Sequence, residues 1–174
     1  DALSQHVIPR LLDKSNGCGT RLRVWSAGCA CGEEPYSIAM LLHEMGLSHL
    51  VSSRSIVATD MSDVSLEKAR AGEYTTNSFR GVQNKYIDKF FDRKDQLLVI
   101  KPEILEAVSF KRLNLSDSGA VREFIAQEGP FHIIFCRNVL IYFNTGLCRQ
   151  ILNHFADGLS GSGTLFLGHA EFPQ

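Results

Sequence analysis

The chain has 174 residues, of which 44% are hydrophobic and 21% are charged, and this is enough apolar material for one well-packed domain. Its formal net charge of −1 excludes the strongly basic surfaces that bind nucleic acid, and no apolar run approaches the ~20 residues that a membrane-spanning helix needs. The five cysteines are an odd number in a chain too large to need disulfide staples, so they favour reduced thiols and a cytoplasmic protein.

Residues 1–15 predict a short helix that leads into the first strand. Apolar side chains recur on one helical face, at Leu3, Val7, Ile8, Leu11 and Leu12. Pro9 would interrupt a helix that began much earlier than Val7, and Asn16-Gly17 is typical of a helix end.

The next stretch predicts a strand, a glycine turn and a helix. Val24–Ala27 is a short apolar run typical of a buried strand, and Gly28 and Gly32 bracket the tight turn that follows. Because glycine has no Cβ, backbone amides in this turn can approach a ligand closely. The helix is expected to start at Pro35, where proline loses no hydrogen bond, and to stop at Gly46. This arrangement is the nucleotide-binding half of a doubly wound sheet.

The charges beside the turn narrow the choice of ligand. Glu33 and Glu34 lie at the positive end of the expected helix and would repel a phosphate, and the turn lacks the three-glycine pyrophosphate fingerprint. The sequence therefore predicts a nucleoside without phosphates that carries a positive or zwitterionic group, and S-adenosylmethionine fits that description. A metal site is not expected, because Cys29-Ala-Cys31 lacks zinc-type spacing.

Residues 55–59 predict a second buried strand, which ends at Asp60. In doubly wound nucleotide folds, an acid at this position binds the ribose hydroxyls. The alternative is that Asp60 caps a helix that starts near Ser62 or Asp63. That helix is expected to include residues 64–71.

A local antiparallel insertion is predicted at about 88–112. Gln96–Ile100 and Val108–Leu113 are short apolar runs typical of strands. The polar stretch Asp92-Arg-Lys-Asp95 is expected to form a hairpin turn.

The rest of the chain returns to alternating strands and helices. After Asn114, which a turn alone could explain, a helix is expected over 121–128 and a buried strand over 131–136. His132 in that strand is expected to be a satisfied edge or core histidine rather than a catalytic base.

The carboxyl end of that strand is the second place where a ligand is expected. Arg137-Asn138 breaks the strand there, and open α/β sheets bind ligands at such ends. Tyr142 follows in an apolar run and could simply belong to the core. A helix capped by Asn144 or Thr145 and a strand over 163–168 complete the predicted α/β doubly wound sheet.

Three blocks of the sequence resemble a known family. Ser26–Ala39, Ala58–Asp60 and Ile134–Phe143 are similar to the signature blocks of the CheR-type chemotaxis receptor methyltransferases, and the similarity runs from about Arg21 to Glu171. The resemblance implies a Rossmann-like class I methyltransferase sheet with a small antiparallel β-subdomain. Residues 1–174 would form one S-adenosylmethionine-dependent methyltransferase domain, without the family's N-terminal helical domain.

The resemblance also implies an activity and a site. The family transfers a methyl group from S-adenosylmethionine to receptor glutamates, a protein-glutamate O-methyltransferase reaction that leaves S-adenosylhomocysteine. By resemblance, Asp60 binds the ribose, Asn114 holds the adenine, and Tyr142 is the catalytic residue beside the departing methyl group. The residues expected to contact the cofactor are Gly28, Gly32, Glu33, Glu34, Asp60, Met61, Asn114, Leu115, Cys136, Arg137 and Asn138.

Partners follow from the same resemblance. The cytoplasmic helices of methyl-accepting chemotaxis receptors are the expected partners, whereas nucleic acid binding and membrane insertion are not expected. Some family members grip a tethering peptide at the receptor C-terminus through a glycine-containing hairpin loop. Asp92-Arg-Lys-Asp95 has no glycine, so this peptide is not expected to bind.

Two other functions stay open at this point. One is a sensor module of the same fold that binds the cofactor without transferring a methyl group, and the other is a methyltransferase for another carboxylate. In the family, an N-terminal domain and a linker arginine cover the reacting end. Because both precede the first residue of this chain, we expect it to bind the cofactor but to methylate receptors slowly or not at all.

Overall fold

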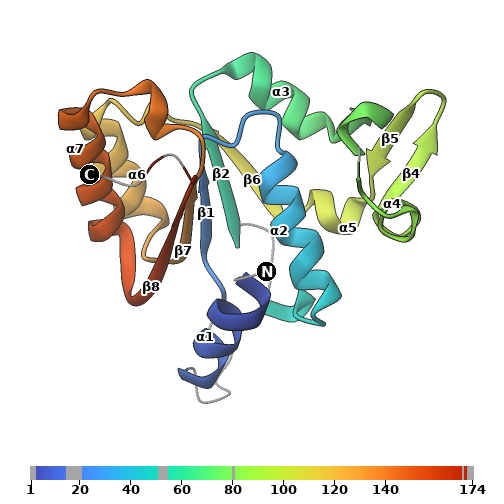
Figure 1. Cartoon of the computed structure of the whole chain (residues 1–174), viewed down its shortest axis with the longest axis horizontal. Helices are drawn as coiled ribbons and strands as arrows, with labels where there is room; N and C mark the ends of the chain where they lie inside the picture. Colours follow the sequence, from blue (N-terminus) through green and yellow to red (C-terminus); the bar gives the residue numbers. More distant parts are fainter. Residues whose placement is uncertain (1–2, 15–20, 51–54, 80, 170, 172–174) are drawn as a thin grey trace.

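The computed structural model describes residues 3–14, 21–50, 55–79, 81–169 and 171. Their central feature is a five-stranded parallel sheet in the order β6-β2-β1-β7-β8 (Figure 1). The strands are β1 (Val24–Ala27), β2 (Ile56–Asp60), β6 (Val108–Arg112), β7 (Phe131–Cys136) and β8 (Leu159–Leu167). The chain builds outward from β1 to β2 and β6, and then returns to place β7 on the other side of β1. This confirms the doubly wound α/β sheet, and the point where the strand order reverses is where such sheets bind ligands.

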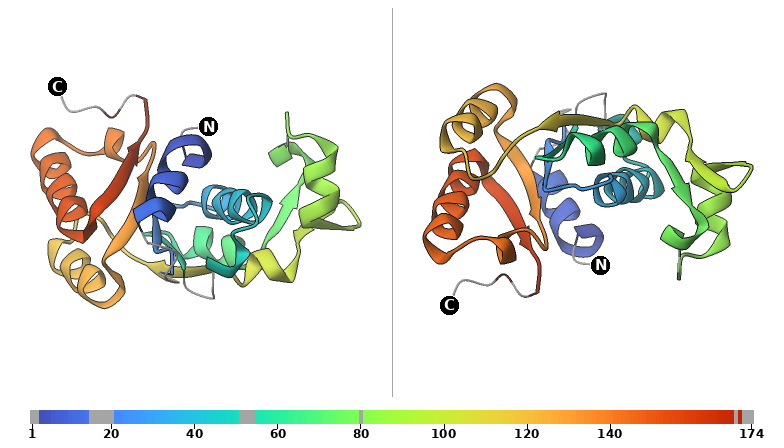
Figure 2. Two further views of the ribbon diagram at one scale, coloured as in Figure 1. Left: turned by 90° about the horizontal axis from the view of Figure 1, so that it is seen from below. Right: turned by 90° about the horizontal axis from the view of Figure 1, so that it is seen from above.

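Helices cover both faces of this sheet, as two further views show (Figure 2). The helices α6 (Ser118–Glu128) and α7 (Thr145–Gly158) pack on one face, whereas α1 (Ile8–Lys14), α2 (Glu33–Glu44) and α3 (Asp63–Ala71) pack on the other. Successive strand residues point to opposite faces, so along β1 Val24 joins the core on the α2 side and Trp25 the core on the α6 side. Both positions must therefore be apolar, which explains the nearly continuous apolar runs in the sequence.

Several predicted ends shift by a few residues. Helix α2 begins at Glu33 rather than Pro35, because proline is tolerated within a first turn. Asn144 is the cap of α7, its Oδ1 accepting a hydrogen bond from the Leu147 N–H at 3.0 Å. Strand β8 begins at Leu159, before the predicted start at residue 163. Further short helices among the described residues are η2 (Ser48–Leu50), η3 (Thr76–Phe79), α4 (Asn84–Phe90), α5 (Pro102–Leu105) and η4 (Leu140–Tyr142).

The N-terminal helix starts earlier than predicted. A π-helical turn, η1 (Leu3–Val7), runs directly into α1. Pro9 does not end the helix, and the chain directly before it takes the wider π-helical turn η1. The side chain of Leu12 and the predicted end at Asn16-Gly17 lie outside the described residues.

The antiparallel insertion exists, but its bounds differ from the predicted 88–112. Its sheet has the order β3-β5-β4, with β3 (Glu73–Thr75), β4 (Phe91–Lys94) and β5 (Leu97–Ile100). Residues 108–112 are instead β6, which pairs parallel with β2 in the main sheet. A short apolar run does not show which strand it pairs with, so the sequence pattern alone places residues 108–112 in the wrong sheet.

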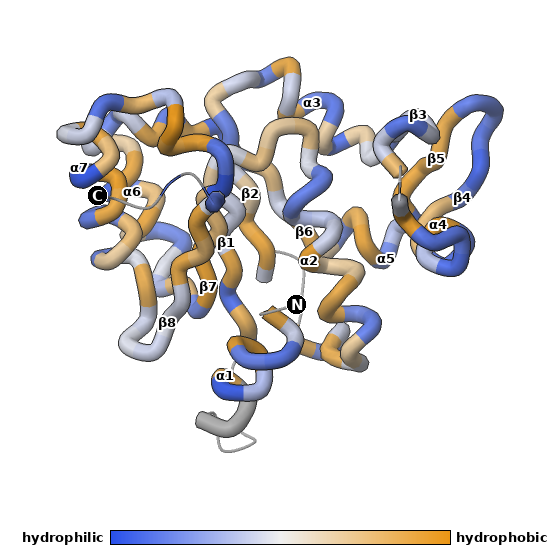
Figure 3. Tube along the Cα trace, in the orientation of Figure 1, coloured by the Kyte–Doolittle hydropathy of each residue, from blue (hydrophilic) through white to orange (hydrophobic). Residues whose placement is uncertain are grey.

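The predicted hairpin turn at 92–95 is also wrong in its bounds. Residues 92–94 belong to β4, and only Asp95 and Gln96 connect the two strands, since Lys94 pairs with Leu97. Most of β4 is exposed and hydrophilic, so its sequence looks like a turn (Figure 3). Asp95 takes a positive φ of 53°, a conformation that aspartate tolerates better than most residues.

None of the helices among the described residues is long and apolar enough to span a bilayer.

Candidate functional site

The glycine turn between β1 and α2 is tied to the end of β2. The N–H groups of Gly28 and Cys29 both donate to the Thr59 carbonyl, at 2.7 and 2.9 Å. Gly28 has a φ of 78° and Gly32 a φ of 92°, so both occupy the left-handed region that favours glycine. A Cβ at Gly28 would lie only 2.4 Å from a methyl carbon of Val139. This glycine is therefore required by the close approach of the loop after β7, as well as by its own backbone.

Asp60 joins two turns at the carboxyl end of β2. Its Oδ2 accepts a hydrogen bond from the Ala30 N–H and its Oδ1 accepts one from the Ser62 N–H, each at 2.9 Å. The cap of α3 is Ser62, whose hydroxyl accepts from the Ser65 N–H. The alternative that Asp60 caps this helix is therefore wrong. Asp60 remains only partly buried, so its carboxylate can still reach a ligand.

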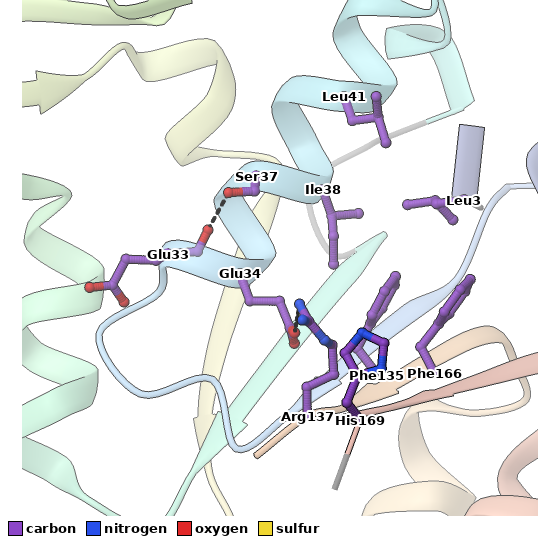
Figure 4. A pocket seen from close by; sticks show the side chains of 10 residues that line it. All are labelled: Leu3, Glu33, Glu34, Ser37, Ile38, Leu41, Phe135, Arg137, Phe166 and His169. Atoms are coloured by element: carbon purple, nitrogen blue, oxygen red, sulfur yellow. Dashed lines mark hydrogen bonds and ion pairs between the residues drawn. The ribbon is translucent and has the colours of Figure 1, made fainter. Parts of the chain in front are cut away.

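Glu34 turns its carboxylate toward β7 from the first turn of α2. Its Oε1 accepts a hydrogen bond from the Ser26 hydroxyl at 2.8 Å, and its Oε2 lies 3.8 Å from Nη1 of Arg137. Figure 4 shows this pair, with the Glu33 side chain pointing away from it. Burial raises the pKa of Glu34, although the Ser26 hydrogen bond and the Arg137 charge partly oppose that effect. Ser26 and Arg137 therefore compensate the charge of the Glu34 carboxylate only in part.

A cavity of about 750 Å³ opens beside this pair. Its polar lining comes from Glu33, Glu34, Ser37, Arg137 and His169. Its apolar lining comes from Leu3, Ile38, Leu41, Phe135 and Phe166 (Figure 4). The cavity thus lies at the reversal point of the sheet, between α2 and the ends of β7 and β8.

The residues predicted to bind the adenine end are less enclosed. Asn114 is exposed, and its Oδ1 accepts hydrogen bonds from the N–H and hydroxyl of Ser116, at 3.0 and 2.8 Å. Its turn role is confirmed, and its adenine contact stays a prediction. Leu115 is buried in the core on the α6 side, whereas Met61 is 62% exposed.

His132 does not take part in this site. Its Nδ1 accepts a hydrogen bond from the Arg23 N–H at 3.1 Å, at the opposite end of β7 from Arg137. Burial, and then the charge of Arg23, lower the pKa of His132, so the ring is neutral at pH 7. The satisfied histidine that the sequence predicts is confirmed.

The segment after β7 carries the remaining predicted residues. Cys136 is fully buried, Asn138 has a positive φ of 59°, and Tyr142 is 80% exposed at the end of η4. Sequence reasoning missed Glu171, whose carboxylate accepts four backbone hydrogen bonds in this region. No local pattern indicates this contact, because Glu171 and the loop it holds are about 30 residues apart in the chain.

Two buried thiols near the site, Cys29 and Cys136, are not nucleophiles at neutral pH. Burial raises the pKa of Cys29 to about 12, and burial likewise raises the pKa of Cys136. Both thiols are therefore protonated at pH 7. Within the described part of the chain, no group of three or more His, Cys, Asp or Glu side chains is arranged to hold a metal ion.

The charge of Glu34 gives a first testable prediction. If Glu34 binds the ligand's ammonium group, a Glu34→Gln variant should bind S-adenosylhomocysteine roughly 10- to 100-fold more weakly, because such a charge-assisted hydrogen bond contributes ~1.5–3 kcal/mol. The same variant should unfold at a higher temperature at pH 7, because a raised pKa means that the folded state disfavours the ionised form. Calorimetric titration and thermal unfolding measure the two effects.

The pH dependence of stability and a control variant show whether the changes in Glu34→Gln come from the charge of Glu34 or from the loss of any carboxylate. Because the pKa of Glu34 is raised in the folded state, its protonated form stabilises the fold, and this advantage is lost as the pH rises through the folded pKa. The two proteins should therefore differ in stability at pH 7 and converge below about pH 4.5. Glu67→Gln, on the exposed side of α3, should change neither quantity. Wild-type affinity in Glu34→Gln would contradict a contact between Glu34 and the ligand's ammonium group.

A family model matches nearly the whole chain. Residues 1–173 match the model of the "CheR methyltransferase, SAM binding domain". The sequence is 43% identical to chemotaxis protein methyltransferase 1 of Pseudomonas aeruginosa and 35% identical to the chemotaxis protein methyltransferase of Escherichia coli. These alignments cover 98% and 95% of this chain, but only 61% and 57% of the two relatives. The chain thus spans about three fifths of the length of these curated relatives.

Solved structures of low sequence identity share the fold. The carbon methyltransferase DszA aligns with a TM-score of 0.53 and 16% identity, over 92% of this chain and 32% of its own. A SAM-dependent methyltransferase from Anabaena variabilis aligns with a TM-score of 0.51 and 11% identity, over 96% of this chain and 51% of its own. These likenesses agree with the class I methyltransferase sheet that the sequence predicts.

Proposed function

The chain belongs to the CheR methyltransferase family, and on this premise we propose that it transfers a methyl group from S-adenosylmethionine to glutamate side chains of chemotaxis receptors. The observation that carries the proposal is the Glu34–Arg137 pair at the reversal point of the sheet. One partner is an anion suited to the cofactor's ammonium group, and the other is a half-exposed cation suited to an acidic substrate. The proposed role is adaptation in chemotaxis.

The residues present fit the cofactor in size and in charge. A cavity of about 750 Å³ lies within the ~300–1,000 Å³ range of small-molecule sites. We assign Asp60 to the ribose hydroxyls, Glu34 to the ammonium group, and Asn114 with Leu115 to the adenine. Five further residues do not line this cavity and are proposed to contact the ligand beside it: Gly28, Gly32, Met61, Cys136 and Asn138. Glu33 lines the cavity, but its side chain points away from the Glu34–Arg137 pair, so we assign it to the edge of the site.

The reaction needs no general base. A glutamate side chain with a pKa near ~4.3 is already ionised at pH 7. When bound, S-adenosylmethionine supplies an electrophilic methyl carbon, whose bond to sulfur breaks as a carboxylate oxygen bonds to it, giving a methyl ester and S-adenosylhomocysteine. No proton moves in this displacement. The neutral His132 and the protonated thiols of Cys29 and Cys136 are therefore consistent with the proposed chemistry.

The protein's contribution would then be alignment and exclusion of water. Such positioning can lower a barrier by roughly 7–11 kcal/mol. We assign Arg137 to the substrate carboxylate and Tyr142, which projects from η4, to the region of the transferred methyl group. A sensor module would bind the cofactor without transferring its methyl group, and an assay of methyl transfer distinguishes the two functions.

Chemoreceptors are the proposed partners, through their cytoplasmic helices, and the cytoplasm is the proposed location. The β4–β5 hairpin is proposed not to grip a receptor C-terminal peptide. Its connection consists of Asp95 and Gln96 alone, without the glycine that close backbone approach favours.

Methyl transfer tests the proposal directly. A protein of the relatives' full length should transfer labelled methyl from S-adenosylmethionine to a receptor cytoplasmic fragment, as a base-labile ester. A fragment with its acceptor glutamates changed to glutamine should take up less than ~1% of the label, because an amide is a far weaker nucleophile than a carboxylate. Equal labelling of small acids such as glutarate would favour the methyltransferase for another carboxylate. Cofactor binding without any transfer would favour the sensor.

A further inference from the structure

Glu171 lies at the centre of a ring of backbone donors. Its Oε2 accepts hydrogen bonds from the N–H groups of Asn138 at 2.8 Å and Gly168 at 2.6 Å. Its Oε1 accepts from Val139 at 2.6 Å and Leu140 at 2.7 Å. The residue is only 7% exposed. One carboxylate therefore joins the chain after β8 to three consecutive residues after β7.

These three residues need such a partner. They precede or begin η4, so their N–H groups have no carbonyl within the helix to bond. Asn138 also holds a positive φ of 59°, in the left-handed region that asparagine adopts more readily than most residues. Burial would raise the pKa of Glu171, but the four backbone hydrogen bonds outweigh it and lower that pKa, so the carboxylate is ionised at pH 7. An ionised carboxylate forms stronger hydrogen bonds with N–H groups than a neutral oxygen does.

The held segment reaches the cofactor site from two sides. Val139 packs directly over Gly28, where even one added carbon would lie 2.4 Å from its methyl carbon. Three residues further on, Tyr142 projects from η4, and the Tyr142 N–H donates to the Val139 carbonyl at 3.2 Å. A shift of Val139 would therefore move both the glycine turn and the base of Tyr142.

We infer that Glu171 is a positioning residue, whose carboxylate holds residues 138–142 in the arrangement that shapes the cofactor site. This inference rests on the proposed function for its cofactor and extends it to a residue that itself contacts no reacting atom. If Glu171 only anchored the end of the chain, its loss would reduce stability and leave the affinity for cofactor unchanged.

Calorimetric titration with S-adenosylhomocysteine separates these two roles. In Glu171→Gln, an amide NH₂ replaces one of the two acceptors, and the dissociation constant should rise about tenfold if only ~10% of molecules keep the competent arrangement. Glu171→Asp keeps the charge and should recover part of the affinity. The control is Glu128→Gln, which breaks ion pairs with Arg23 and Lys111 away from the site and should leave the dissociation constant within about twofold. Wild-type affinity in Glu171→Gln would overturn the inference.

A second pair of variants leaves Glu171 itself in place. A Cβ at Gly168 would lie 2.5 Å from Glu171 Oε2 and 3.1 Å from the Asn138 nitrogen, so Gly168→Ala should displace the carboxylate and weaken binding in the same way. Gly161 lies on the same chain segment, in β8, and a Cβ there meets nothing within 4 Å. Gly161→Ala is therefore the matched control and should bind as the wild type does. Equal effects of the two alanines would overturn the inference.

Amide proton resonances test the loop without any cofactor. The N–H protons of Asn138, Val139 and Leu140 should move upfield in Glu171→Gln, because their charge-assisted hydrogen bonds are lost. Unchanged resonances would overturn the inference whether or not the protein binds S-adenosylhomocysteine. If the resonances move as expected but the wild type binds no S-adenosylhomocysteine, the held loop stands and the proposed function fails.

Discussion

An Asp60→Ala variant will bind S-adenosylhomocysteine at least ~100-fold more weakly than the wild type, because the two charge-assisted hydrogen bonds that we propose Asp60 makes to the ribose would contribute ~1.5–3 kcal/mol each. The variant also frees the Ala30 N–H, so the glycine turn loses a fixed contact before any ligand arrives. The fold itself should lose less than ~2 kcal/mol, since Asp60 lies at the edge of the core. Calorimetric titration and chemical denaturation give the two numbers.

Two further variants make the Asp60 result specific. Asp60→Asn keeps a neutral acceptor and should lose less affinity than the alanine variant. Ser62→Ala removes the cap of α3, at about 1 kcal/mol of stability, while leaving the Asp60 carboxylate and the Ser62 N–H in place. Its affinity should match the wild type. If Ser62→Ala and Asp60→Ala lose affinity equally, Asp60 acts through the fold and not through the ribose.

Trp25→Ala will lower the free energy of unfolding by roughly 3–5 kcal/mol, more than any other variant proposed for this protein. Trp25 is fully buried, and its ring packs against Phe124, Phe131 and Phe155 with centroid distances of 4.8, 5.3 and 5.1 Å. Its Nε1–H donates to the Thr59 hydroxyl at 2.9 Å. The melting temperature should fall by about 6–20 °C, since each kcal/mol shifts a domain of this size by ~2–4 °C.

The matched variants for Trp25 differ in what they remove. Trp25→Phe keeps an aromatic ring in the cluster and should lose clearly less stability than the alanine variant. Tyr142→Ala removes a large ring that is 80% exposed and should change stability by no more than ~0.5 kcal/mol. A loss below ~1 kcal/mol for Trp25→Ala would show that the α6 and α7 side of the sheet does not depend on this cluster.

The strands of the central sheet could largely be predicted from the sequence. Residues 24–27 and 131–136 are buried on both faces except at the partly buried His132, so they form runs that are apolar apart from Ser26 and His132, and the glycines after β1 mark the turn. The partner of a strand is not local information, however. Val108–Arg112 pairs with β2, about 50 residues earlier, and nothing within five residues distinguishes it from a hairpin strand.

In the candidate site, residues marked by a local pattern could likewise be predicted, whereas contacts between distant parts of the chain could not. Asp60 and Glu34 could be predicted because each follows a recognisable strand or turn. Glu171 could not, because its partners are backbone N–H groups, which every residue except proline carries. The contact between Gly28 and Val139 was hidden in the same way, since it depends on β1 and β7 being neighbours.

The position of β6 has a consequence for how the protein behaves at high concentration. Among the described residues, its outer side pairs with no further strand, and such an edge is a template for association with the edge of another molecule. Two cations lie on this strand, Lys111 with Glu128 and Arg112 with Asp63 as ionic partners. Charged side chains of this kind discourage edge-to-edge aggregation, because a second strand would have to bring its own groups against them. Lys111 and Arg112, which have no role in the proposed chemistry, thus protect the β6 edge against association with a second molecule.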